Sequence, residues 1–226
     1  MITFYDIAST VFVELQTIPY KTEWIEWSDI ESVCKRMGIP PSTKKADGSD
    51  FYTLPAIYDP STNTGVSDSL VIAAYLDKTY PNKPTLLPAG TEALHAAFVD
   101  AFVSKMGSFR LFLSVMLKRL SPSTVDFFIS SRPAILGRPF LGIIPVGDEL
   151  QAEWKNLEAS LSTVDGWYQR NGGGPFIMGD KPTFADFVVG GLLGLGKALS
   201  DDIPEWKDVL EWNDRRWKKL WRNTRM

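Results

Sequence analysis

Two short segments of the chain hold the groups best suited to binding a ligand. The first is Thr53-Leu54-Pro55-Ala56-Ile57, where a proline interrupts an extended apolar run. A proline is tolerated inside a strand when its peptide bond is cis, because the bend turns the preceding backbone groups out of the ladder. We therefore predict a cis Leu54-Pro55 bond, with the amide and carbonyl of Leu54 open to an extended peptide, as in strand addition.

The second segment is Ser67-Asp68-Ser69, at the start of an amphipathic helix predicted over 68–80. Free amides and the positive dipole end suit a carboxylate, Ser69 adds a hydroxyl, and the acid of Asp68 suits an ammonium group. A ligand with both groups on one carbon beside a peptide backbone fits the two segments together, and the γ-glutamyl end of glutathione has that form. Taken separately, a trans edge-strand proline and an ordinary N-cap pair also explain them.

The order of elements in the first part of the chain is β, β, α, β, β, α. Apolar periodicity and turn residues predict this order over 2–7, 20–27, 28–37, 51–59, 66–67 and 68–80. Prolines at 81, 84 and 88 indicate a linker. Beyond it, apolar residues at helical spacing predict helices over 91–120, 150–170, 183–199 and 205–221, with broken helix between 121 and 149. The fold class is therefore α/β followed by all-α.

A third motif, Thr183-Phe184-Ala185-Asp186, has the spacing of a helix capping box. Residues three apart at a helix start can each bond the other's backbone amide, with Asp here in place of the usual Glu. This is a folding signal and carries no chemistry.

Together these motifs resemble the glutathione transferase superfamily. Its glutathione-binding half looks like the first part of this chain, with a strand, a Leu-Pro pair, a hairpin, an acid-Ser pair and an Ala-rich helix in that order. The capping box is similar to the one in its helical domain. The segments Tyr20-Lys21-Thr22-Glu23-Trp24 and Tyr52-Thr53-Leu54-Pro55 are most similar to the fungal-specific class A enzymes, which are related to lignin β-etherases.

The resemblance implies a thioredoxin-like domain over 1–84 and a helical domain over 85–226. It also implies a homodimer. It assigns glutathione binding to Leu54, Pro55, Asp68 and Ser69, and we expect a hydrophobic ligand site lined by Phe102, Met106 and Arg110. Thr183 and Asp186 keep a structural role.

The segment after the first strand departs from the family pattern. Relatives have a catalytic Ser, Tyr or Cys there, in the fungal class within a Ser-Pro-Asn-type loop, but only the ten residues Ala8 to Thr17 lie between Ile7 and Ile18. A parallel crossover needs about ten to twelve residues simply to return. We therefore predict that the first helix is absent or reduced to about a turn, with the first strand displaced or swapped into a partner.

The nearest hydroxyls to the missing loop are those of Ser9 and Thr10, which are the candidate catalytic groups. Without a helix dipole, the glutathione thiol should keep a pKa near its free value and conjugation should be weak. Two hypotheses stand: a detoxifying transferase that conjugates glutathione to an aromatic electrophile or cleaves an ether with it, and a ligandin-like protein that binds glutathione or an aromatic molecule without catalysis.

The composition and net charge limit the classes of molecule that the protein is expected to bind. A formal charge of −3 gives no general attraction to nucleic acid or to a membrane surface, and the tryptophans and basic residues of 212–225 are interpreted as a solvated helix face. The start lacks a secretory signal and no apolar run is long enough to span a bilayer, so we expect a cytoplasmic protein. With Cys34 as the single cysteine and His95 as the single histidine, no metal site is expected.

Overall fold

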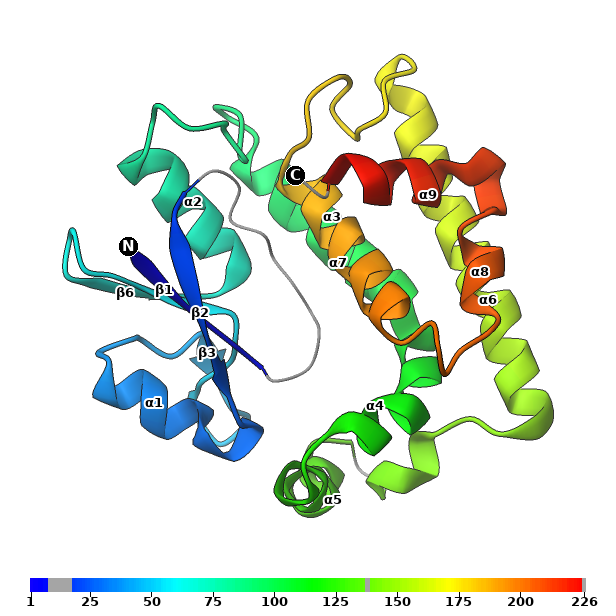
Figure 1. Cartoon of the computed structure of the whole chain (residues 1–226), viewed down its shortest axis with the longest axis horizontal. Helices are drawn as coiled ribbons and strands as arrows, with labels where there is room; N and C mark the ends of the chain where they lie inside the picture. Colours follow the sequence, from blue (N-terminus) through cyan, green and yellow to red (C-terminus); the bar gives the residue numbers. More distant parts are fainter. Residues whose placement is uncertain (8–17, 137–138, 225–226) are drawn as a thin grey trace. The chain divides into compact units, whose positions relative to one another are not determined.

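The computed structural model describes residues 1–7, 18–136 and 139–224, drawn as coloured ribbon in Figure 1. The chain divides into two compact units, with the division falling between Pro88 and Ala89. The first holds a small mixed sheet and the second is helical, which confirms the predicted thioredoxin-like and all-helical fold class.

The first unit is built on a four-stranded sheet in the order β2-β1-β5-β6. Its strands are β1 (Ile2–Ile7), β2 (Tyr20–Ile25), β5 (Ala56–Asp59) and β6 (Thr64–Ser67). β1 runs parallel to β2 and antiparallel to β5, and β5 pairs antiparallel with β6. The other elements are η1 (Trp27–Asp29), α1 (Ile30–Arg36), the short hairpin β3 (Thr43–Lys44) and β4 (Asp50–Phe51), and α2 (Ser69–Thr79).

Alternation along the strands gives the sheet two apolar faces. Tyr5 and Ala56 pack with Ile30, Val33 and Cys34 of α1 in one buried cluster. α2 packs against β5 and β6, and in Figure 1 it lies across the sheet from α1. Successive side chains of a strand point to opposite faces, so the buried runs of β1 and β5 can serve both layers.

The parallel pairing of β1 with β2 corrects one expectation. Ile2 lies opposite Tyr20 and Ile7 opposite Ile25 within one chain, so the prediction of a displaced or swapped first strand is wrong. The prediction assumed that the connection must be helical. Twelve residues of any chain can reach about 40 Å, and a six-residue strand is only about 20 Å long, so the length of the connection allows the parallel pairing. The predicted loss of the first helix falls on 8–17, outside the described residues.

The β5–β6 hairpin is held by a buried carboxylate. Asp59 is 1% exposed, and its oxygens accept hydrogen bonds from the hydroxyls of Tyr80 (2.6 Å) and Tyr75 (2.8 Å) and from the amide and hydroxyl of Ser61. Burial alone would raise the pKa of Asp59, but these donors outweigh it and lower the pKa. The network ties α2 to the hairpin.

The second unit is all helical in its described part. Its longer helices are α3 (Glu92–Lys105), α5 (Pro122–Leu136), α6 (Gly147–Tyr168), α7 (Phe184–Ala198) and α9 (Trp212–Thr224). Shorter ones are η2 (Met106–Phe112), α4 (Leu113–Arg119), η3 (Phe140–Ile143), η4 (Gln169–Asn171) and α8 (Trp206–Val209). The helix predicted over 91–120 is therefore interrupted by a 3₁₀ stretch, which hydrophobic spacing alone does not reveal. None of the described helices could cross a membrane.

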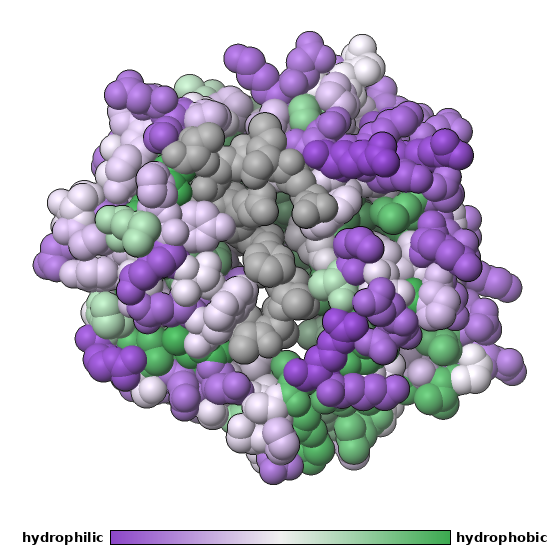
Figure 2. All heavy atoms as spheres, viewed as in Figure 1, coloured by the Kyte–Doolittle hydropathy of each residue, from purple (hydrophilic) through white to green (hydrophobic). Residues whose placement is uncertain are grey.

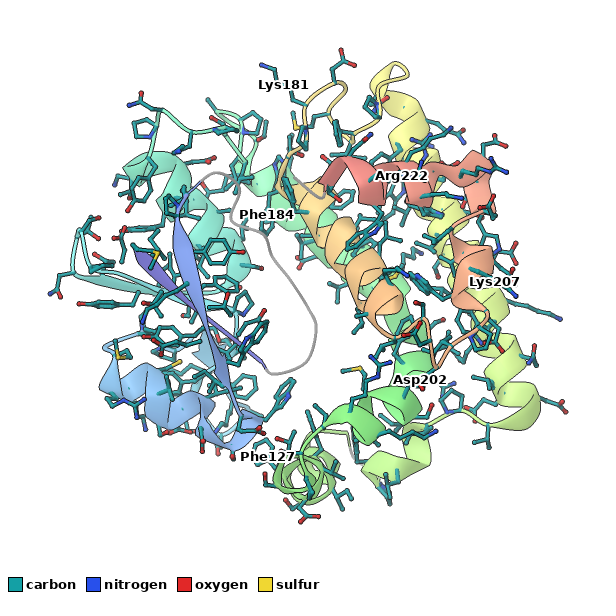
Figure 3. The ribbon with its side chains drawn as sticks, in the orientation of Figure 1. Phe127, Lys181, Phe184, Asp202, Lys207 and Arg222 are labelled. Carbon is teal, nitrogen blue, oxygen red and sulfur yellow. The ribbon has the colours of Figure 1, made fainter. Side chains whose placement is uncertain are left out.

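α7 is the central helix of this unit. It begins at Phe184, labelled in Figure 3, and its buried residues pack with α6, α8 and α9 in one apolar core. Arg215, Lys219 and Arg222 of α9 are exposed at the surface, where hydrophilic residues predominate in Figure 2. Trp217 is fully buried, and Arg216 pairs with the buried carboxylate of Asp165. This arrangement is that of a helix anchored by its tryptophans with a solvated polar face.

Candidate functional site

Strand register brings the two predicted binding segments to one edge of the sheet. Ala56 pairs with Ser67 across β5 and β6, so Leu54-Pro55 before Ala56 and Asp68-Ser69 after Ser67 leave the sheet at the same end. Segments 13 residues apart in sequence, from 55 to 68, thus become neighbours through an antiparallel hairpin.

The backbone before β5 is open at Leu54. The Leu54-Pro55 peptide bond is cis, as predicted. Neither the amide nor the carbonyl of Leu54 bonds to another backbone group in the described part of the chain. The preceding Thr53 is fixed, because its hydroxyl lies 2.7 Å from that of Ser42. A held backbone with an unused donor and acceptor suits an extended peptide ligand.

Asp68 occupies the N-cap of α2 with a positive φ of 74°. One of its oxygens, Oδ1, accepts from the amides of Leu70 (2.9 Å) and Val71 (3.1 Å). Oδ2 makes no hydrogen bond within the described ranges, and neither does the hydroxyl of Ser69. Asp68 is therefore an N-cap, as the simpler interpretation has it, and still keeps one carboxylate oxygen for an ammonium group.

The sequence did not predict the hydrogen bonds that hold a neighbouring loop against this edge of the sheet. The hydroxyl of Ser67 donates to the carbonyl of Pro40 (2.8 Å), and the amide of Ser42 donates to the carbonyl of Phe51. These bonds hold the 40–54 segment beside the end of β6. The position of Ser67, directly before the acid-Ser pair, was the only signal for this role.

The candidate catalytic residues Ser9 and Thr10 lie outside the described residues. The strand that leads to them is described: Tyr5 pairs with Ala56, so the carboxyl end of β1 lies at the edge where Pro55 precedes β5. The chain thus leaves β1 at the end of the sheet that also holds Leu54 and Asp68.

The three residues expected in a hydrophobic ligand site lie within the helical unit. Phe102 is 4% exposed in the main core, stacked against Phe98 at 6.2 Å between ring centroids, and Met106 packs on the same core. Arg110 is paired: its guanidinium contacts Glu149 (2.7 Å) and Glu153 (2.6 Å) and donates to the carbonyl of Ile143. Arg110 thus links η2, η3 and α6, and its role toward a ligand stays a prediction.

The Arg110–Glu153 pair predicts a pH-dependent contribution to stability. The hydrogen bond from Arg110, opposed by burial and aided by Ser108, lowers the pKa of Glu153 from its ordinary 4.5. A carboxyl with a lowered folded pKa stabilises the fold above the unfolded pKa and loses that contribution as pH falls through the folded pKa. We expect Glu153→Gln to cost about 1 kcal/mol at pH 7 and progressively less below pH 4.

Urea unfolding at a series of pH values measures this difference. Glu158→Gln, an exposed substitution on the same helix, is the control and should change stability by less than about 0.5 kcal/mol at every pH. A deficit of Glu153→Gln that stays constant down to pH 3 would contradict the assignment.

The capping box is present as predicted. Asp186 accepts from the amide (2.8 Å) and hydroxyl (3.1 Å) of Thr183, and also from the amide of Ile177 (2.9 Å). Burial raises the pKa of Asp186 even though these bonds oppose the shift. The buried hydroxyl of Tyr168 lies near the same carboxylate without a bonding contact in the described chain.

The single cysteine and histidine are both packed inside. Cys34 is 1% exposed in α1, and burial raises the pKa of its thiol, which disfavours a nucleophilic role. His95 is 3% exposed, with Nδ1 2.9 Å from the carbonyl of Thr91. Within the described ranges no three His, Cys, Asp or Glu side chains are grouped as metal ligands.

Comparison with known proteins agrees with this geometry. The family model for the glutathione S-transferase C-terminal domain matches residues 93–226, which is more than half of the chain. The chain belongs to the glutathione S-transferase family. It is 28% identical over 217 residues to the glutathione S-transferase-like protein ustS of Aspergillus flavus, covering 90% of this chain and 76% of that protein.

Solved fungal glutathione S-transferases share the whole architecture. The enzyme CsGST63524 of Ceriporiopsis subvermispora, crystallised in complex with glutathione, is 33% identical, with a TM-score of 0.87 over 100% of this chain and 98% of that chain. Glutathione transferase GSTFuA3 from Phanerochaete chrysosporium is also 33% identical, with a TM-score of 0.87 over 99% of this chain and 95% of that one. The chain thus matches these fungal relatives along nearly its whole length.

Proposed function

We propose that this glutathione S-transferase binds glutathione at the sheet edge formed by Leu54-Pro55 and Asp68-Ser69. The observation that carries the proposal is the Ala56–Ser67 register, which joins an open peptide backbone and a helix N-terminus with a free carboxylate oxygen. Relatives of 33% and 36% identity that were crystallised with glutathione support it.

The groups at this edge fit the ligand's chemistry. The amide and carbonyl of Leu54 match the donor and acceptor of the cysteinyl backbone. The amide and the hydroxyl of Ser69, at the start of α2, suit the γ-glutamyl carboxylate, while Oδ2 of Asp68 suits its ammonium. The carboxylate of the γ-glutamyl end thus meets hydrogen-bond donors, and its ammonium meets a negatively charged oxygen.

Removing either polar group should weaken glutathione binding. Asp68→Asn keeps an N-cap side chain but removes the charge, and Ser69→Ala removes a hydroxyl, so each should cost about 1–3 kcal/mol of binding free energy. Titration calorimetry measures the affinity. Asp47→Asn, at the exposed turn between β3 and β4, is the matched control and should bind as the parent protein does. Unchanged affinity in both site variants would exclude this site.

We further propose that bound glutathione reacts with an aromatic electrophile. The thiol gives its proton to water, the thiolate sulfur bonds to the electrophilic carbon, and a leaving group, a phenolate in the case of an ether, departs with its electron pair. Ser9 and Thr10 are the proposed hydroxyl donors to the thiolate, because the chain leaves β1 at the sheet edge that holds the glutathione site. Phe102, Met106 and Arg110 remain the proposed contacts for the electrophile.

The pKa of the bound thiol tests whether the protein is a catalyst. Ultraviolet absorbance of the thiolate is recorded against pH with glutathione bound. Without a helix dipole the pKa of the thiol would stay near that of free glutathione, whereas a pKa lowered by about two units or more would show that another group, Ser9 or Thr10 in this proposal, activates it. Turnover of a generic aromatic electrophile should then follow that ionisation. An unshifted pKa together with no turnover, in a protein that binds glutathione, would favour the non-catalytic ligand-binding alternative.

We also propose that the protein is a homodimer. Light scattering at micromolar concentration tests this, and the mass of a monomer would contradict it.

A further inference from the structure

A polar groove of about 490 Å³ lies within the helical unit. One wall is the end of α3 and the start of η2, and the other is a face of α6. The side chains that give it its chemistry are Lys105, Ser108, Glu153, Asn156, Ser160 and Thr163. The glutathione-binding edge belongs to the other unit, so the groove is a separate feature.

The hollow results from the size of the side chains along α6. Positions 153, 156, 160 and 163 recur at helical spacing and share one face. A neighbouring stripe of the same helix, Leu157, Leu161 and Val164, is buried in the core. Long charged residues normally cover a solvent-facing helix surface, but here short polar ones stand opposite Gly107, and the space between the walls stays open.

The groove has one uncompensated charge. The carboxylate of Glu153 is neutralised by Arg110 at 2.6 Å, with Ser108 and Asn156 as further donors. The ammonium of Lys105 makes no ion pair or hydrogen bond with any residue in the described ranges, and neither does the hydroxyl of Ser160. The free charge of Lys105 favours an anionic group. The hydroxyl of Thr163 donates to the carbonyl of Ala159 (3.0 Å), so its oxygen is left as an acceptor for a hydroxyl of the ligand.

We propose that this groove binds a small hydrophilic anion, a carboxylate or phosphate that also carries hydroxyl groups. Lys105 holds the anionic group, and Asn156, Ser160 and Thr163 bond to the hydroxyls. The volume is within the range of ligand pockets, about 300–1,000 Å³. Gly107 and Ala159 are the only nonpolar residues among those that line it, so it offers no platform for an aromatic electrophile.

Titration with defined probes tests this proposal. Gluconate and glycerol 3-phosphate, each a hydroxylated anion, are titrated into the full chain at low ionic strength, with chemical shifts of the α6 amides as the readout. We expect saturable binding of one or both at millimolar concentration or tighter. Lys105→Met should weaken it about tenfold or more by removing the charge. Lys155→Met, which removes an exposed lysine of α6 outside the groove, should leave it unchanged.

Blocking the groove provides a second variant. Ser160→Trp should abolish binding of the anions while the far-ultraviolet circular dichroism and the affinity for glutathione stay those of the parent protein. Three results would overturn the proposal: no saturable shift with either anion, equal binding to Lys105→Met, or tighter binding of neutral glycerol than of glycerol 3-phosphate. Shifts of these amides that follow protein concentration alone would also overturn it, in favour of contact with a second copy of the chain.

Discussion

Replacing Gly196 with alanine is expected to destabilise the helical unit by about 3 kcal/mol or to prevent its folding. A Cβ at Gly196 would lie 2.2 Å from Cζ2 of Trp206, far inside van der Waals contact. Trp206 is 1% exposed and packs edge-on against Phe112 at 5.7 Å between ring centroids, so it has no free space into which to shift. The gain of about 1 kcal/mol in helix propensity cannot offset such a clash.

Gly191 supplies the matched control on the same helix. A Cβ there meets no atom within 4 Å, so Gly191→Ala should stabilise the protein by about 0.5–1 kcal/mol through helix propensity. Chemical unfolding of the two variants, monitored by circular dichroism, measures the difference. Equal stability of the two would show that Gly196 is not in contact with Trp206.

Replacing Asp186 with alanine is expected to cost about 2–4 kcal/mol, more than the roughly 1 kcal/mol of a helix cap. The additional cost arises because Asp186 is fully buried and also accepts the amide of Ile177 from the preceding loop. Its loss leaves the buried amide of Thr183 and the half-buried amide of Ile177 without their acceptor, at about 1–3 kcal/mol for an unsatisfied buried group. Relief of the burial that raises the pKa of Asp186 offsets part of this cost.

Thermal and urea unfolding measure the loss, and Asp180→Ala is the control because Asp180 is exposed in the same loop. The control should change stability by less than about 0.5 kcal/mol. Glutathione affinity of the folded Asp186→Ala protein should equal that of the parent. A variant that folds with normal stability and binds glutathione weakly would contradict the structural role assigned to the capping box.

The candidate glutathione site could be predicted in large part because its signals are local. A proline inside a strand and an acid-Ser pair at a helix start are recognisable from a few residues, and the short hairpin between them requires that they meet. Ser67 and Ser42 could not be assigned, since their partners Pro40 and Thr53 are set by how a separate loop packs.

By itself the sequence determined the order of the main helices and strands, the cis Leu54-Pro55 bond, the cap at Asp68 and the capping box of Thr183 and Asp186. Each depends on residues within a turn or two, where backbone sterics and hydrogen bonding decide the outcome. Only the tertiary structure decided which strand pairs in parallel with β1, where η2 interrupts the helix predicted over 91–120, that Arg110 pairs with glutamates of α6, and that Asp186 is fully buried. These features depend on contacts between residues that are distant in the chain. The energies of such contacts come from burial and charge pairing, which a local sequence pattern does not indicate.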